Sequence, residues 1–300
     1  MKVAVLMSTY NGDEYLKEQI ESILGQKGDF ELTLIVRDDG SIDGTQHILS
    51  EYEGKKQLQW YQGDNKGPAH SFWDLILNTH GFDFYAFADQ DDFWEEDKIY
   101  RALISMHNKN ADVYCCNALM VDQQLCSIGR PVYRVPPKTD FYTITCAGGI
   151  LGCTLVFSSA IREIICENMM PQNIIMHDFY LCLLSVSIGK KLVYDEFIGL
   201  KYRLHGRNVV GVSKSKLQAI YELLNTISNP IRVSIAEQAN DILECYGSII
   251  SEEKKNWLKV ISLYRKSLFT RMSLALTKKT KYSSLNSSIR NRLTILFGKR

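Results

Sequence analysis

FDFYAFADQDDFW, residues 82–94, is the segment from which we interpret the rest of the sequence. Its first half is apolar and aromatic, which is typical of a buried strand, and four polar residues, Asp89-Gln90-Asp91-Asp92, interrupt it. The acidic run Glu95–Asp97 then indicates the start of a helix. Carboxylates at the end of a buried strand cost stability unless a cation lies beside them. The segment therefore predicts a hard divalent metal that itself holds a phosphate.

The same order of buried strand, polar loop and helix occurs four times in the first ~107 residues. Such alternation predicts a parallel sheet with helices on both faces, in which ligands bind beyond the carboxyl ends of the strands. Three polar loops follow predicted strands, so we expect them to converge in space. They are Ser8–Gly12, Asp38–Ser41 and Asp89–Asp92.

Beyond residue 112 the pattern changes to shorter strands, a Pro-containing irregular segment around residues 131–137 and a helix over 174–187. Short strands are predicted at 192–194 and 198–202. From about residue 213 the pattern is helical only. We therefore expect a catalytic domain over residues 1–212 and a helical, basic extension over residues 213–300.

Charge is distributed unevenly along the 300 residues, although the net charge is only +1. Residues 254–300 contain 13 Lys/Arg and no Asp or Glu. An acidic body with a basic tail predicts contact with an anionic surface rather than with nucleic acid, for which no motif is present. One apolar stripe is typical of a helix at the membrane interface, the alternative being a helix packed on the protein or in a homodimer. Its residues are Trp257, Ile261, Tyr264, Leu268, Met272 and Ala275.

The eight cysteines form no CxxC pair, which favours buried reduced thiols. The first residues lack the pattern of a signal peptide, and no apolar run reaches the ~18 residues of a membrane span. We therefore expect a cytoplasmic protein that is peripheral to the inner face of the cell membrane.

The converging loops carry the residue types that a sugar-nucleotide site requires. Asp38 or Asp39 is suited to accept from a pyrimidine N–H, and Asp89 and Asp91 are suited to hold ribose and a Mg²⁺ or Mn²⁺ ion. Taken alone, Asp38–Ser41 is more typical of a turn, and Asp89–Asp92 is also typical of a helix cap. Three such loops at successive strand ends together favour the functional interpretation. Asp178 is either a base for a sugar hydroxyl or a helix N-cap, and the residues alone favour neither.

A basic loop lies further along the chain. His205, with Arg203 and Arg207, fits either a metal or diphosphate contact or a solvated basic loop, and the residues alone favour the solvated loop.

Seven segments between Lys2 and Val212 together resemble the inverting family 2 glycosyltransferases of the GT-A fold, most closely bacterial rhamnosyltransferase-like members. The Gln at position 90 stands where small residues are common in the wider family. The segments are STYNG (8–12), RDDGSIDGT (37–45), NKG (65–67), ADQDDFW (88–94), GCTLVF (152–157), MHDFYL (176–181) and YRLHGRNVVG (202–211).

The resemblance implies a Rossmann-like, mostly parallel mixed sheet flanked by helices, and it assigns roles to individual residues. Asp178 becomes the catalytic base. Metal ligands are Asp91, Asp89 and His205, and Arg203 and His205 contact the diphosphate. The nucleotide sugar is held by Ser8, Tyr10, Asp38, Asp39, Lys66, Gly67 and Asp89, and the acceptor by Gly149, Gly152, Trp94 and His177.

The implied reaction is inverting transfer from a nucleoside diphosphate sugar to a lipid-linked glycan in bacterial surface polysaccharide synthesis. The favoured donor is dTDP-L-rhamnose, followed by a UDP-hexose. A sugar nucleotidyltransferase is less favoured, because the STYNG loop lacks a basic residue. A catalytically silent binding scaffold is the non-enzymatic alternative. No GxGxxG follows a strand, which disfavours a nicotinamide enzyme.

Overall fold

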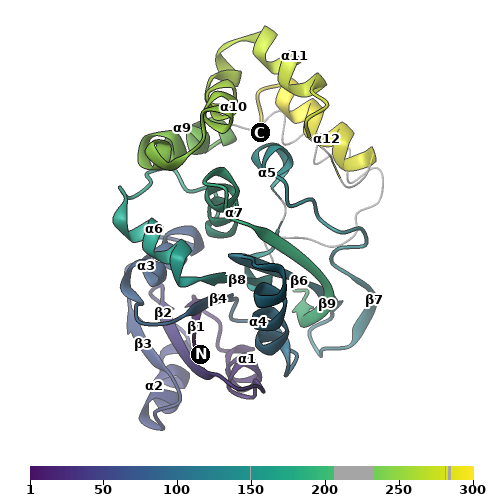
Figure 1. The fold of residues 1–300 in the computed structure, drawn as a ribbon. Helices are drawn as coiled ribbons and strands as arrows, with labels where there is room; N and C mark the ends of the chain where they lie inside the picture. Colours follow the sequence, from purple (N-terminus) through teal and green to yellow (C-terminus); the bar gives the residue numbers. More distant parts are fainter. Residues whose placement is uncertain (149, 206–232, 281, 283–284) are drawn as a thin grey trace.

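The computed structural model describes residues 1–148, 150–205, 233–280, 282 and 285–300 (Figure 1). Within these residues, nine strands form one sheet in the order β3-β2-β1-β4-β8-β6-β9-β5, with β7 paired to β6. Four strands at one side are mutually parallel: β1 (Lys2–Thr9), β2 (Glu31–Asp38), β3 (Gln59–Gln62) and β4 (Phe84–Ala88).

The other half of the sheet is mixed. Strand β8 (Leu155–Ser158) runs antiparallel between β4 and β6 (Val113–Val121), whereas β9 (Leu192–Arg203) is parallel to β6. The short strands β5 (Phe93–Trp94) and β7 (Ser127–Pro131) add antiparallel pairs at β9 and β6. The predicted mixed, mostly parallel α/β fold is thus confirmed.

The parallel half follows from residues that are apolar on both faces of a strand. In β1, Ala4 and Leu6 join the hydrophobic cluster on one face, while Val3, Val5 and Met7 join the cluster on the other. Each face is covered by helices, so such a strand is buried on both sides. On one side these are α1 (Leu16–Leu24), α2 (Thr45–Gly54) and α4 (Lys98–Lys109), and on the other α3 (Pro68–Asn78), α6 (Ser159–Glu167) and α7 (His177–Ser187).

Several elements differ from the sequence prediction. The two short strands expected at 192–194 and 198–202 form the single strand β9, whose pairing with β6 shifts register between Cys115 and Ala118. The region around the prolines contains β7 and the helix α5 (Phe141–Ala147), which Asp140 caps by accepting from the Thr143 N–H. All eight cysteines are free and five are buried, as expected for reduced thiols.

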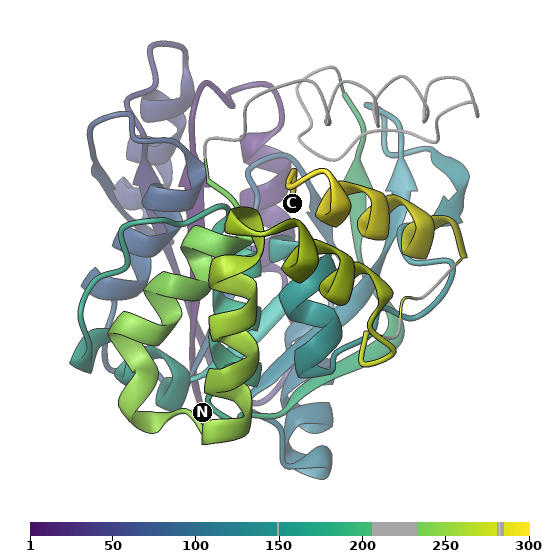
Figure 2. The same ribbon diagram turned by 90° about the horizontal axis from the view of Figure 1, so that it is seen from above.

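The C-terminal helices form a layer at the top of Figure 1 that faces the viewer in Figure 2. They are α9 (Ile235–Tyr246), α10 (Glu252–Leu263), α11 (Leu268–Leu276) and α12 (Leu285–Leu296). Ile235, Leu258 and Ile261 belong to the same hydrophobic cluster as Phe72 and Phe87, on one face of the sheet. The described part of the extension therefore shares its core with the catalytic body. The predicted boundary at residues 212/213 lies outside the described residues.

The prediction that one apolar helical stripe lies at the membrane interface is wrong for most residues of the stripe. Ile261, Tyr264 and Ala275 are buried against the protein, and the Trp257 indole donates to Thr145 Oγ1 at 2.9 Å. The helix also breaks, because a 3-10 turn at Tyr264–Lys266 and the N-cap Ser267 separate α10 from α11. Among the described residues, no helix is both long and apolar enough to cross a bilayer.

Candidate active site

A cavity of about 650 Å³ opens where the loops after β1, β2 and β4 meet. The three loops expected to converge do so here, because parallel strands present their carboxyl ends at one edge of the sheet. The cavity is lined by most of the residues that the sequence assigned to the site: Ser8, Tyr10, Asp39, Gly67, Asp89, Asp91, Gly152, His177, Asp178 and His205.

The two adjacent aspartates after β2 have different roles. Asp39 faces the cavity, where its carboxylate accepts from the backbone N–H of Gly67 at 2.8 Å and pairs with the Arg37 guanidinium. Asp38 is fully buried and accepts from Thr9 Oγ1 and from the Ser41 N–H. The expectation that Asp38 lines the nucleotide pocket is therefore wrong, since its carboxylate fixes the turn from inside.

The glycine-containing loop before α3 meets the site mainly through its backbone. The Lys66 N–H donates to both oxygens of Asp39 at 3.2 Å, while the Lys66 side chain is exposed. Gly67 adopts a φ of +80°, a conformation that side chains rarely permit, and Pro68 follows as the first residue of α3. This loop thus holds Asp39 in place and leaves Gly67 in the cavity wall.

Carboxylates crowd the end of β4. Burial, followed by the nearby carboxylates of Asp91 and Asp178, raises the pKa of Asp89 to about 7. Asp91 Oδ2 lies 2.6 Å from His205 Nε2, and the His205 ring stacks on Tyr15 with centroids 5.5 Å apart. Asp89, Asp91 and His205 line the cavity and offer carboxylate oxygens and an imidazole nitrogen. This donor set fits Mn²⁺ or Mg²⁺, which prefer oxygen ligands, with His as an additional ligand.

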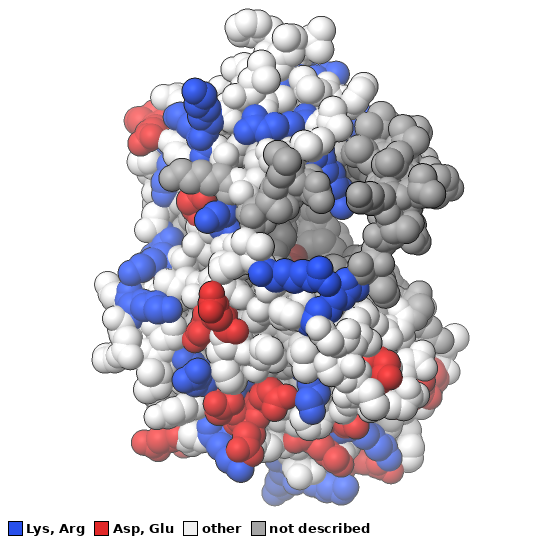
Figure 3. All heavy atoms as spheres, turned by 90° about the vertical axis from the view of Figure 1, so that its right-hand side faces the viewer, with Lys and Arg blue, Asp and Glu red and all other residues white. Residues whose placement is uncertain are grey.

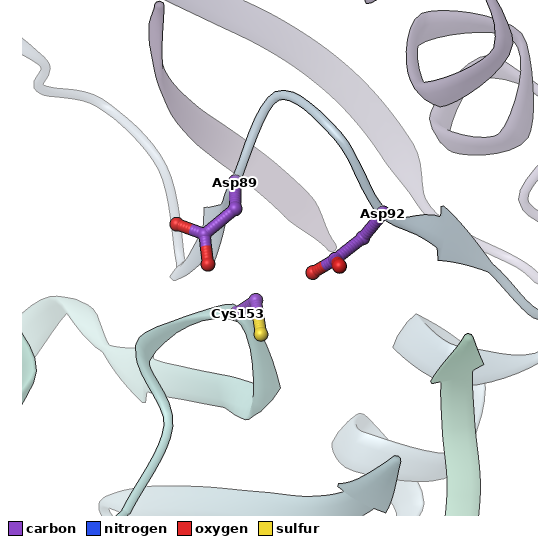
Figure 4. Close-up of side chains that lie close together, drawn as sticks. All are labelled: Asp89, Asp92 and Cys153. Carbon is purple, nitrogen blue, oxygen red and sulfur yellow. The ribbon is translucent and has the colours of Figure 1, made fainter. Parts of the chain in front are cut away.

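A second group lies below the same loop, where Asp89 and Asp92 point toward Cys153 (Figure 4). Asp92 is fully buried, and its Oδ2 has no hydrogen-bond partner among the described residues. Burial raises the pKa of both Asp92 and the Cys153 thiol, so this thiol stays protonated. A protonated thiol is a poor ligand for a hard cation. The cavity-facing set is therefore the better metal site.

Asp178 is the second residue of α7, and it lies at the wall shared by two cavities. Its Oδ2 accepts from the Gly152 N–H at 3.0 Å and its Oδ1 from the Phe179 N–H at 2.6 Å. Burial raises the pKa of Asp178 to about 6, and these hydrogen bonds offset the rise only in part. A carboxyl with a pKa near 6 is ionised at neutral pH and basic enough to accept a proton.

The second cavity has about 510 Å³ and is mainly apolar. It is built from distant parts of the chain: the segment after β7, the end of α5, the start of α7 and the C-terminal residues. Its lining includes Val132, Tyr133, Ile150, Leu151, Ile175, Met176, Asp178, Phe179, Ile235, Lys299 and Arg300.

Two further assignments are corrected by the fold. Trp94 is 1% exposed and lies in the core, where Lys98 Nζ sits 3.2 Å from its ring centroid, so the residue does not reach either cavity. Arg203 is also 1% exposed. Its guanidinium donates to the Asp91 carbonyl at 2.8 Å and pairs with Glu18, so it supports the loop after β4 and is not among the residues that line the cavity. Gly149 lies outside the described residues.

Gln90 was assigned no role from the sequence, although its side chain joins two of the loops. Gln90 Oε1 accepts from the Tyr10 N–H at 2.8 Å, and its Nε2 donates to the Tyr10 carbonyl at 3.2 Å. A Cβ at Gly12 would collide with this amide. The sequence shows a glycine in the first loop and a polar residue between two aspartates in the third, which could have indicated a contact. That these two residues meet is decided by the fold.

Residues 4–165 match the family model described as glycosyl transferase family 2. The dTDP-rhamnosyl transferase RfbG of Shigella flexneri is 29% identical over 253 residues, covering 79% of this chain and 85% of the relative. The putative teichuronic acid biosynthesis glycosyltransferase TuaG of Bacillus subtilis is 27% identical over 158 residues, covering 51% and 60%. The S. aureus TarS structure in complex with UDP-GlcNAc has the same fold, with a TM-score of 0.59, 19% identity and coverage of 99% and 82%. With more than half of its residues inside the family model, the chain belongs to glycosyl transferase family 2.

Proposed function

We propose that the protein transfers a sugar from a nucleoside diphosphate sugar to a glycan hydroxyl, with inversion at the anomeric carbon. One observation carries the proposal: Asp178 lies at the wall shared by a carboxylate-rich cavity and an apolar one. A base in this place can take the proton of an acceptor hydroxyl that enters from the apolar side, while the anomeric carbon of the donor is held on the other side. Direct attack of the acceptor oxygen on this carbon is a single displacement and therefore inverts the configuration.

The carboxylate-rich cavity is suited to the donor. Asp39, Tyr10 and Gly67 line the cavity and would contact the nucleotide, and Asp89, Asp91 and His205 would hold a divalent cation at the diphosphate. When bound, this cation supplies positive charge that stabilises the diphosphate as it leaves. We favour dTDP-L-rhamnose as donor, because RfbG is named a dTDP-rhamnosyl transferase. A UDP-hexose is the second candidate, because TarS was solved with UDP-GlcNAc.

In the proposed step, the acceptor oxygen forms a bond to the anomeric carbon while the bond from that carbon to the diphosphate oxygen breaks. The electron pair leaves with the nucleoside diphosphate. The acceptor proton passes to an Asp178 carboxylate oxygen. The Gly152 and Phe179 N–H groups hold the two oxygens of this carboxylate, so that its orientation is set before the acceptor arrives.

The acceptor we propose is a lipid-linked glycan of a bacterial surface polysaccharide. Support comes from the TuaG relative, whose name refers to teichuronic acid biosynthesis, and from the apolar second cavity beside Asp178. Sugar rings have apolar C–H faces that pack on side chains such as Phe179.

We further propose that the outer face of α11 contacts a membrane with anionic lipids. Leu268, Phe269, Met272 and Leu276 project from one side of this helix and are 66%, 82%, 47% and 71% exposed. Lys266, Lys278 and Lys279 near its ends are exposed, and residues 254–300 contain no Asp or Glu. Figure 3, which views the molecule from the right-hand side of Figure 1, shows few Asp and Glu in its upper half, whereas in its lower half Asp and Glu are interspersed with Lys and Arg. Exposed apolar side chains with lysines near both ends of the helix suit an anionic interface.

Flotation with phosphatidylcholine vesicles containing phosphatidylglycerol tests this contact. Phe269→Glu combined with Leu276→Glu is expected to lower the partition coefficient roughly 10-fold or more, because two apolar side chains no longer enter the interface. Met169→Glu is the matched control, since Met169 is 64% exposed elsewhere. Unchanged flotation of the double variant, or loss of a dimer in light scattering instead, would reject the membrane contact.

A donor screen tests the proposed function. UDP-, GDP- and dTDP-sugars are incubated with the full chain, Mn²⁺ or Mg²⁺ and a bacterial membrane extract as acceptor, and nucleoside diphosphate release is measured with and without EDTA. We expect acceptor-dependent release, highest with dTDP-L-rhamnose and lowered by EDTA. Nucleotide binding without release from any donor would indicate a silent scaffold, and pyrophosphate exchange would indicate a nucleotidyltransferase.

A further inference from the structure

Gln90 lies between Asp89 and Asp91 in the loop after β4, and its side chain crosses to the loop after β1. Its amide meets both backbone polar groups of Tyr10, since Oε1 accepts from the N–H at 2.8 Å and Nε2 donates to the carbonyl at 3.2 Å. The two residues beside Gln90 line the first cavity, and so does Tyr10. The Gln90 amide therefore fixes two walls of this cavity to each other.

The loop after β1 is held from both sides. Three successive backbone N–H groups of this loop each donate to a side chain from another segment: two hydroxyl groups on the side of β2 and the Gln90 amide on the side of β4. Because β1 lies between β2 and β4 in the sheet, removing the amide would leave the loop held on one side only. The pairs are Tyr10 with Gln90, Asn11 with Ser41 at 2.9 Å, and Gly12 with Thr45 at 2.8 Å.

Gly12 provides the space that this amide occupies. A Cβ at position 12 would lie 2.3 Å from Gln90 Oε1 and 2.4 Å from the amide carbon, which is closer than side chains pack. The amide is the end of a flexible side chain, so an added methyl group would displace the amide rather than the backbone. A methyl group at position 12 therefore breaks the Gln90 contacts without any change at residue 90.

A nucleoside diphosphate with its cation would contact both loops at once. Tyr10 is 48% exposed in the cavity, and its aromatic ring is suited to pack on a nucleobase. Asp91 and His205, whose Oδ2 and Nε2 atoms lie 2.6 Å apart, would hold the cation at the diphosphate. A ligand that spans two sites binds more tightly when the sites are already fixed relative to each other, because less conformational freedom is lost on binding. A ligand that meets one loop alone gains nothing from such a link.

We propose that Gln90 is a positioning residue that fixes the separation of the nucleotide and cation sites and thereby raises the affinity for the metal-bound nucleoside diphosphate. The proposal rests on the proposed function, because it assumes a nucleoside diphosphate and a divalent cation in the first cavity. The competing explanation is that Gln90 only stabilises the local fold of one loop. In that case, replacing Gln90 would weaken the binding of the nucleoside alone or of the cation alone.

The test compares three ligands on the full chain: Mn²⁺ alone by calorimetry, a nucleoside alone by NMR titration, and the matching nucleoside diphosphate with Mn²⁺ by calorimetry. The nucleotide is whichever of UDP, GDP and dTDP the wild type binds most tightly. Gln90→Met, which keeps the length and removes the amide, is expected to weaken binding of the diphosphate with Mn²⁺ about 10-fold, the order of magnitude for two lost hydrogen bonds. The affinities for Mn²⁺ alone and for the nucleoside alone should change less than about 2-fold. Gln124→Met is the matched control, since Gln124 is exposed and lines neither cavity, and it should change none of the three.

A second variant leaves Gln90 in place. Gly12→Ala should weaken binding of the diphosphate with Mn²⁺ by a similar factor, because its Cβ displaces the amide. In a Gln90→Ala background, where no amide stands in the way, Gly12→Ala should cost no more than about 2-fold. Thermal unfolding confirms that each variant is folded.

Three results would overturn the proposal. One is a Gln90→Met protein that binds the diphosphate with Mn²⁺ as tightly as the wild type. Another is an equal loss of affinity for Mn²⁺ alone or for the nucleoside alone, because disturbance of a single loop would then explain the effect. The third is additive losses for Gly12→Ala and Gln90→Ala, since the methyl group would then act without Gln90. If the wild type binds no nucleoside diphosphate in the presence of Mn²⁺, the proposed function fails; if it binds one and Gln90→Met binds it equally well, only this inference fails.

Discussion

The two cavities on either side of Asp178 differ in charge and in origin. The first is lined by Asp39, Asp89 and Asp91 and is built from loops that follow parallel strands. The second is mainly apolar, and residues as distant in sequence as Tyr133 and Arg300 form its walls. Under the proposed function, this difference implies that the two substrates are recognised by different means. The charged donor would be held through a cation on the carboxylates at one sheet edge, whereas the acceptor sugar would be held by shape beside a base.

Of the predicted effects on activity, the loss of transfer on removal of the proposed base should be the largest. Asp178→Asn is expected to lower transfer by about 10³-fold, within the range for a lost general base, and to change nucleoside diphosphate affinity by less than about 2-fold. Asp140→Asn is the matched control, since Asp140 also begins a helix but lines neither cavity. Transfer rates with saturating donor and calorimetry with the nucleotide measure both quantities. Near-normal transfer by the folded Asp178→Asn protein would refute the assigned base.

Replacing a proposed metal ligand should weaken Mn²⁺ binding in the first cavity and leave the second cavity unchanged. Asp91→Asn is expected to raise the Mn²⁺ concentration needed for half-maximal activity by roughly 10- to 100-fold, because His205 and Asp89 would remain as ligands. Direct Mn²⁺ titration by calorimetry supplies a readout that is independent of turnover. Asp97→Asn, which changes the N-cap of α4 outside the cavity, should leave Mn²⁺ affinity unchanged. Equal Mn²⁺ affinities for both variants would remove Asp91 from the metal site.

The raised pKa of Asp178 predicts a pH dependence at the wall between the cavities. The base must be ionised, so transfer should fall about tenfold per pH unit below the pKa of about 6 and level off above it. The same shift means that the folded state binds this proton more tightly than the unfolded state. The stability due to the shift is present below pH 4 and is lost as pH rises through 6.

Rates and thermal unfolding measured from pH 4 to 8 check this pH dependence. Relative to wild type, Asp178→Asn should gain stability at pH 8 and lose that gain below pH 4. A rate that is flat from pH 5 to 8 would contradict the assignment.

The smallest expected effects are changes in KM when one aromatic residue in the lining of each cavity is replaced. Phe179 lines only the second cavity and Phe72 only the first. Phe179→Leu should raise the acceptor KM roughly 3- to 10-fold with an unchanged donor KM, and Phe72→Leu should show the opposite pattern, because each loses apolar contact with one substrate. Initial rates with each substrate varied in turn give both constants. If both variants raise the same KM, the two cavities do not divide donor from acceptor.

The sequence by itself determined the parallel half of the sheet and the position of the site. Runs such as Val3–Met7 are apolar at every position, and only a strand covered on both faces buries them all. The polar residues after β1, β2 and β4 then had to meet at one edge. For the same reason the local pattern predicted Asp89, Asp91 and one of the pair Asp38 and Asp39 as candidate site residues, and Asp178 was predicted from its place at the start of a helix with the help of the family resemblance.

Only the tertiary structure decided which of several similar residues face a substrate. Asp38 and Asp39 are neighbours of the same type, and strand alternation together with partners from β1 and the Gly67 loop turns one inward and the other outward. Arg203 pairs with Glu18, and Ile261, Tyr264 and Ala275 of the stripe are buried in the core, through contacts with segments far away in sequence. A helical stripe has the same pattern whether lipid or protein covers it, because burial of apolar surface is non-directional. The partner that covers a stripe is therefore a property of the assembled fold.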